Sequence, residues 1–96
     1  MIEIIKDKRT IKFYGDIKVN KIKNVYKTLL DNIEDIKKWD KIKIDIRELE
    51  SADSSFYQIL ISLTRSFKDK IRISTVNDDI QKDLSFYRLF IKTSSV

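Results

Sequence analysis

The sequence predicts a small α/β domain in which helices pack on a mixed β-sheet. With no proline and one glycine, the 96 residues contain no linker, so we take residues 1–96 as a single domain. Short segments that alternate isoleucine with polar residues are separated by longer segments with apolar residues three and four positions apart. The resulting order is β-β-α-β-α-β-α, and each strand–helix–strand unit should pair its strands in parallel through a right-handed crossover.

Residues 2–14 are predicted to form a hairpin of two short strands. Isoleucines dominate the first strand, and apolar residues alternate with lysine in the second. The polar run 6–9 connects them. We expect Gly15 and Asp16 to end the second strand, because glycine tolerates the backbone angles of a turn.

Residues 19–39 carry the clearest helical pattern. Asp16 or Asn20 is the expected N-cap, and Trp39 is interpreted as an anchor at the end of the helix. The apolar positions recur at helical spacing and predict one continuous buried face: Val19, Ile22, Val25, Tyr26, Leu29, Leu30, Ile33 and Ile36.

Residues 41–46 alternate lysine or aspartate with isoleucine, which predicts a strand. Residues 47–52 break this alternation and are expected to form a loop in which Leu49 and Ala52 point inward.

The second half of the chain is predicted to hold two helices and a strand. Apolar residues at helical spacing favour a helix over about 54–67 and another from 77 to about 90. The segment 70–76 between them alternates apolar and polar residues and is the predicted strand. Residues 92–96 are expected to fray, and a last edge strand is expected to be missing or reduced to 89–91.

Composition excludes several classes of function. The chain has no histidine and no cysteine, so it has no Ser-His-Asp triad, no thiolate chemistry and no His- or Cys-based metal site. Gly15 alone cannot build a phosphate-binding glycine loop. No segment is apolar for long enough to span a membrane. We therefore expect a cytoplasmic protein that is not an enzyme and binds no cofactor or small-molecule substrate.

The net charge of +5 raises the possibility of nucleic-acid binding. The lysines, however, alternate with isoleucines and are mixed with acidic residues, as on the solvated faces of strands and helices. A small basic domain that binds nucleic acid through the lysines of residues 18–43 remains an alternative.

The most specific segment is Asp53-Ser54-Ser55, which follows a strand and precedes an apolar helix. This arrangement resembles the STAS domain (sulfate transporter and anti-sigma factor antagonist), in which a strand leads to an Asp-Ser-Ser-Gly turn and then a helix. The resemblance covers residues 1 to about 90. Phe56 stands where the family has its glycine.

The resemblance implies a STAS-type fold and a bacterial phosphoprotein in signal transduction. Its partner would be an anti-sigma-type serine kinase or a related regulator. Ser55 is then the expected phosphoacceptor, and Ser54 is the second choice. An alternative within the same family is a constitutive subunit of a membrane transport complex that is not phosphorylated.

Two readings of the serines remain open. The first N–H groups of a helix favour anions, and a phosphate there would repel Asp53, so the segment can act as a switch. Alternatively, Ser55 and Gln58 form a capping box, or Asp53 or Ser54 caps the helix.

The helix after the serines offers a possible partner-binding surface. Tyr57 and Ile61 either widen the buried face or form an exposed apolar strip, with Gln58 and Arg65 at its rim. The expected partner-binding residues are Asp53, Phe56, Tyr57, Gln58, Ile61 and Arg65.

Overall fold

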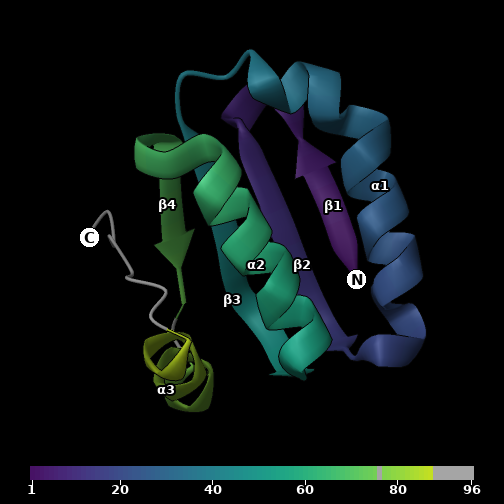
Figure 1. The fold of residues 1–96 in the computed structure, drawn as a ribbon, viewed down its shortest axis with the longest axis vertical. Helices are drawn as coiled ribbons and strands as arrows, with labels where there is room; N and C mark the ends of the chain where they lie inside the picture. The colour runs from purple at the N-terminus through teal and green to yellow at the C-terminus, as the bar shows by residue number, and fades with distance from the viewer. Residues whose placement is uncertain (76, 88–96) are drawn as a thin grey trace.

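The computed structural model describes residues 1–75 and 77–87, and these contain the predicted strands and helices in the predicted order (Figure 1). The strands are β1 (Ile2–Ile5), β2 (Thr10–Ile17), β3 (Ile42–Ala52) and β4 (Ile71–Ser74). The helices are α1 (Val19–Lys37), α2 (Ser54–Phe67) and α3 (Asp78–Phe86). Short 3-10 turns at Lys6–Lys8 and Lys68–Lys70 connect neighbouring elements.

The four strands form one mixed sheet in the order β1-β2-β3-β4. β1 and β2 are the predicted antiparallel hairpin, whereas β2, β3 and β4 run parallel. Both crossovers step in the same direction along the sheet, so right-handed connections place α1 and α2 on the same face. Figure 1 shows both helices in front of the sheet and α3 beyond the end of β4. The predicted α/β class and element order are confirmed.

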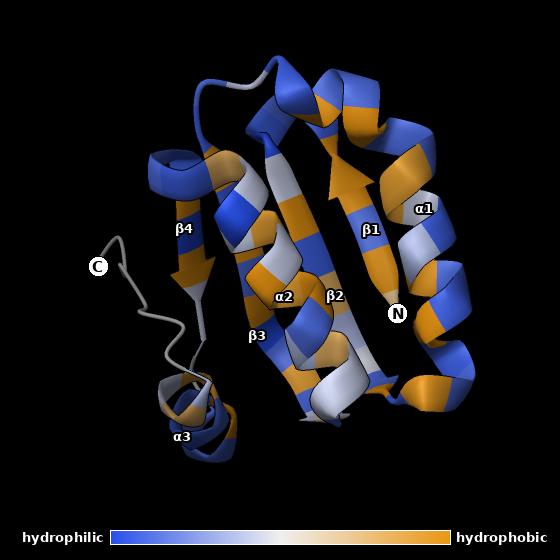
Figure 2. Ribbon diagram, viewed as in Figure 1, coloured by the Kyte–Doolittle hydropathy of each residue, from blue (hydrophilic) through white to orange (hydrophobic). Residues whose placement is uncertain are grey.

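The two faces of the sheet differ in character. One row of residues in register across all four strands is entirely isoleucine: Ile4, Ile11, Ile44 and Ile73. The neighbouring row is entirely polar: Glu3, Lys12, Asp45 and Ser74. Because successive side chains in a strand point to opposite faces, the isoleucine row meets the helices and the polar row lies on the other face. The alternation is visible along the strands in Figure 2.

The prediction of a loop over residues 47–52 is wrong, because β3 continues to Ala52, which pairs with Ile17 at the end of β2. Two register irregularities interrupt this pairing, and β3 contributes the extra residue at each. Such bulges break the alternation of polar and apolar side chains, which is why the segment resembled a loop. Leu49 is nevertheless buried and Ala52 packs against the core, as expected.

Gly15 does not end β2, which continues through it to Ile17. The glycine adopts a φ of +77°, in the region that other residues rarely occupy, at the second irregularity of the β2–β3 pairing. Its conformational freedom is therefore used within the strand.

Helix α1 differs from the prediction at its start and on its surface. Lys18 is the N-cap residue and makes no side-chain capping bond, so neither Asp16 nor Asn20 is the cap. Asp16 instead accepts a hydrogen bond from the Ser51 hydroxyl. Trp39 is buried after the end of the helix, as an anchor there should be. Of the predicted apolar face, only three residues are buried: Val25, Leu29 and Ile36.

Several predictions fall outside the described residues. They concern Val76 at the end of the last strand, the helix beyond residue 87, the edge strand at 89–91 and the fraying of 92–96.

Candidate functional site

Asp53 caps two helices with one carboxylate. Its Oδ1 accepts the backbone N–H of Ser55 at 3.0 Å, which makes it the N-cap of α2. Its Oδ2 accepts the backbone N–H of Val19 at 2.9 Å, at the start of α1. The first N–H groups of a helix have no acceptor within the helix. Lys18, the N-cap residue of α1, supplies none from its side chain, so the Asp53 carboxylate takes that role for the N–H of Val19.

The carboxylate of Asp53 is held in its charged form. The pKa of Asp53 lies below its ordinary value, chiefly because the Ser55 hydroxyl donates to Oδ1 and further because the N–H groups of Val19 and Ser55 donate to it. The positive ends of two helix dipoles favour the same charge.

The two serines have different environments. Ser55 is half-buried in the first turn of α2, and its hydroxyl donates to Asp53 Oδ1. Ser54 is exposed and lines a shallow cleft of about 370 Å³ between the start of α2 and α3, together with Asp83 and Phe86. The reading in which Asp53 caps the helix is therefore confirmed, and Gln58 lies exposed outside this network.

Phe56 and Tyr57 do not offer side chains to a partner, so that part of the expected surface is wrong. Phe56 is fully buried and packs edge-on against Phe13, with ring centroids 5.1 Å apart. Tyr57 is only 2% exposed and stacks on Tyr87 at 4.9 Å. Both side chains belong to the buried core. Phe56 and Tyr57 lie three positions before Ile59 and Leu60 respectively, so they share the inner face of α2 with them.

The hydroxyl of Tyr57 ties α2 to α3 by donating to Asp83 Oδ2 at 2.8 Å. Burial, followed by this hydrogen bond to a carboxylate, raises the pKa of Tyr57 well above its ordinary value. Nothing local in the sequence indicates that Asp83 meets Tyr57, because the two residues lie 26 positions apart on different helices.

The expected strip beside the serines is not an exposed apolar surface. Ile61 is half-buried against the core, whereas Gln58 and Arg65 are exposed. The wide buried face is thus the correct reading of Tyr57 and Ile61.

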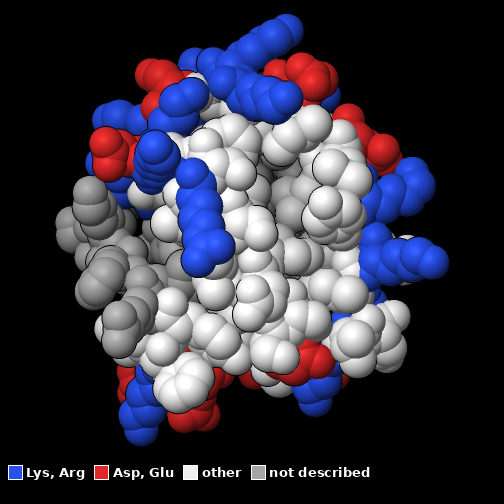
Figure 3. All heavy atoms as spheres, in the orientation of Figure 1, with Lys and Arg blue, Asp and Glu red and all other residues white. Residues whose placement is uncertain are grey.

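Two large exposed apolar side chains of α1 lie beside α2 instead. Tyr26 is 55% exposed and Leu30 is 53% exposed. They flank a groove of about 510 Å³ between α1 and α2. We call it the α1–α2 groove and define it by Tyr26, Leu30 and Ile33 on α1 and Ile59, Leu63 and Phe67 on α2. Figure 3 shows it as a largely uncharged area, with basic residues and some acidic residues along its upper rim and on its right side.

No known protein-family profile, curated protein or solved structure matches the chain. Within residues 1–75 and 77–87, no three acidic side chains gather as a metal ion would require. No helix in these ranges combines the length and apolar character needed to cross a membrane.

Proposed function

We propose that the chain is a non-enzymatic regulatory domain of the STAS type that binds a partner protein in the cytoplasm. By the resemblance of Asp53-Ser54-Ser55, the partner is an anti-sigma-type serine kinase or a related regulator. Ser55 is the phosphoacceptor, and Ser54 is the second choice. The unmodified domain binds the partner, and the phosphorylated domain is released.

The observation that carries this proposal is the bond from the Ser55 hydroxyl to Asp53. A phosphate on Ser55 removes the donated proton and adds roughly −1.5 to −2 charges beside the carboxylate. That carboxylate also accepts the N–H of Val19, so repulsion at Ser55 acts on the starts of both α1 and α2. A single phosphate therefore alters the surface around the N-termini of both helices.

Phe56 is compatible with this role although it replaces the family's glycine. Its side chain lies in the core against Phe13, so it does not cover Ser55 from the outside. The surface left for a partner at this end consists of Ser54, Ser55, Gln58 and the rim of the cleft beside α3.

The test is phosphorylation of the full chain by its cognate kinase with ATP, read by intact mass. We expect one phosphate on the wild type and on Ser54→Ala and none on Ser55→Ala. Loss in Ser54→Ala alone would move the site to Ser54. If no form of the chain takes up phosphate, the switch is wrong. A pull-down that then captures transporter ATPase subunits would assign the chain to the constitutive transport role instead.

A further inference from the structure

The α1–α2 groove has a recessed apolar floor and exposed apolar walls. Leu29, Ile59 and Leu63 are almost fully buried at its base, whereas Tyr26 and Leu30 stand exposed beside them. Exposed apolar surface of this kind, shaped as a concavity and bordered by polar residues, is typical of interaction sites. Its lining residues come from the second half of α1 and from most of α2, and the groove is open to solvent on this face of the molecule (Figure 3).

The dimensions of the groove fit a short helix. On α1 the lining residues Tyr26, Leu30, Ile33 and Lys37 follow one another at i, i+4, i+7 and i+11, along one face of the helix. Eleven residues of helix correspond to roughly 16 Å, or about three turns. A partner helix with apolar residues at the same spacing presents a complementary ridge to this channel.

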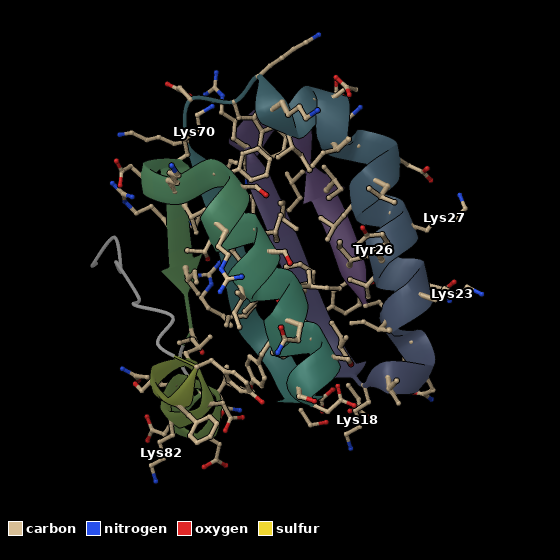
Figure 4. The ribbon with its side chains drawn as sticks, in the orientation of Figure 1. Lys18, Lys23, Tyr26, Lys27, Lys70 and Lys82 are labelled. Carbon is tan, nitrogen blue, oxygen red and sulfur yellow. The ribbon has the colours of Figure 1, made fainter. Side chains whose placement is uncertain are left out.

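The charge around the groove specifies the partner's chemistry. Lys70 Nζ donates to the Lys37 carbonyl at 3.5 Å, which places this lysine at the Lys37 end of the groove. Lys23 and Lys27 extend from the outer side of α1, away from α2 (Figure 4). Lys37 itself lines the groove, and no acidic residue does so among the described residues. Helix α2 contains no acidic residue at all. Lys37 pairs with Glu34 at 3.5 Å and Lys27 with Asp31 at 2.9 Å, and the two acidic residues lie on α1 outside the groove lining. Exposed pairs of this kind are weak, so a carboxylate of a partner can replace Glu34 beside Lys37.

We propose that the α1–α2 groove binds an amphipathic helix of a partner protein whose apolar face is flanked by acidic residues. A second copy of this chain is a poor occupant, because in a symmetric contact each groove lining would offer the other Lys37 and no carboxylate. A membrane surface would reach the exposed Tyr26 and Leu30 but not the recessed floor of the groove. This proposal shares with the proposed function only the assignment of the domain to partner binding. It does not require phosphorylation of Ser55.

The probe is a labelled synthetic peptide of about fifteen residues with leucine at i, i+4, i+7 and i+11 and glutamate at flanking positions. Its binding to the full chain is measured by fluorescence anisotropy. We expect saturable binding that weakens as salt rises, because the rim lysines are exposed and screened. A peptide with lysine in place of every glutamate should bind at least about fivefold more weakly.

Leu30→Glu places a charge on the groove wall and should weaken binding by at least about tenfold. Tyr14→Glu is the matched control: Tyr14 is 39% exposed and lies beside Lys12 on the opposite face of the sheet, outside the groove, and the change should leave affinity within about twofold. Lys37→Glu, which reverses the charge in the groove lining, should weaken binding of the acidic peptide and improve binding of the lysine peptide. Thermal melts of all variants exclude unfolding as the cause, because the altered positions are exposed.

Other outcomes would overturn the proposal. Equal binding of both peptides, or no effect of Leu30→Glu, would show that the groove does not recognise an acidic helix. Leu30-dependent binding to vesicles of phosphatidylserine and phosphatidylcholine, without peptide binding, would assign it to a lipid surface. A dimer in sedimentation that Leu30→Glu disrupts, without peptide binding, would assign it to self-association. Ser55→Ala should bind the peptide normally, which separates this result from a failure of the phosphorylation switch.

Discussion

Replacing Asp53 by alanine should destabilise the domain about twice as much as the loss of an ordinary helix cap. The carboxylate accepts backbone N–H groups at the starts of both α1 and α2. Loss of one N-cap acceptor costs about 1 kcal/mol, so two amount to about 2 kcal/mol. For a domain of this size, this corresponds to a fall in Tm of roughly 8–16 °C, at about 4–8 °C per kcal/mol. The loss is a substantial part of a total stability of about 5–15 kcal/mol.

The matched control is Asn77→Ala. Asn77 is also an N-cap, and its side chain accepts the N–H groups of Asp79 and Ile80, but it serves the single helix α3. Urea unfolding of both variants gives the comparison. We expect Asp53→Ala to cost about 2 kcal/mol and Asn77→Ala about 1 kcal/mol. Equal costs would refute the view that Asp53 serves two helices.

The contribution of Asp53 should also depend on pH with a defined sign. Its pKa is lowered in the folded protein, so the folded state favours the charged carboxylate. The stability it contributes is therefore complete above the unfolded value of about 3.9 and is lost as the pH falls through the lower folded value. The wild type and Asp53→Ala should differ at pH 7 and converge in strong acid. A difference that persists below both pKa values would point to packing instead of the charge.

Four further predictions concern individual side-chain contacts. Phe56→Ala should cost about 3–5 kcal/mol in urea unfolding, because a fully buried aromatic ring is removed, whereas a surface role would leave stability nearly unchanged. Arg47→Leu should raise the pKa of Asp45, whose carboxylate accepts two guanidinium hydrogen bonds at 3.0 and 2.8 Å, and an unchanged carboxyl titration by NMR would contradict this. Tyr57→Phe should cost about 0.5–1.5 kcal/mol through loss of the bond to Asp83. In the wild type, the phenol of Tyr57 should stay protonated above pH 10, followed by ultraviolet absorbance, and ionisation at the ordinary value would refute its burial.

The elements that the sequence predicted well depend on local patterns. Helix α2 begins at Ser54 and ends at Phe67 as expected, because an Asp-Ser-Ser cap and a regular apolar stripe both lie within the segment. The strand ladder of isoleucines follows from alternation alone, and the α/β class follows from the order of the elements.

The α1–α2 groove could not be predicted in the same way. The helical spacing of Tyr26 and Leu30 is as regular as that of the buried residues of α1, so periodicity places all of them on one face. How much of a wide apolar face is covered depends on the neighbouring helix. Here α2 covers the side of α1 that carries Leu29 and leaves Tyr26 and Leu30 exposed.

The shared cap at Asp53 depends on the two irregularities in β3. At the start of the β2–β3 pairing Thr10 lies beside Lys43, an offset of 33 positions, and at its end Ile17 lies beside Ala52, an offset of 35. The final register brings Asp53 level with Lys18, one residue before the Val19 N–H that it accepts. With an unbroken register, Asp53 would lie two strand residues farther along, roughly 6–7 Å beyond this position. The same bulges that hid the strand from the sequence pattern therefore carry the carboxylate to the start of α1.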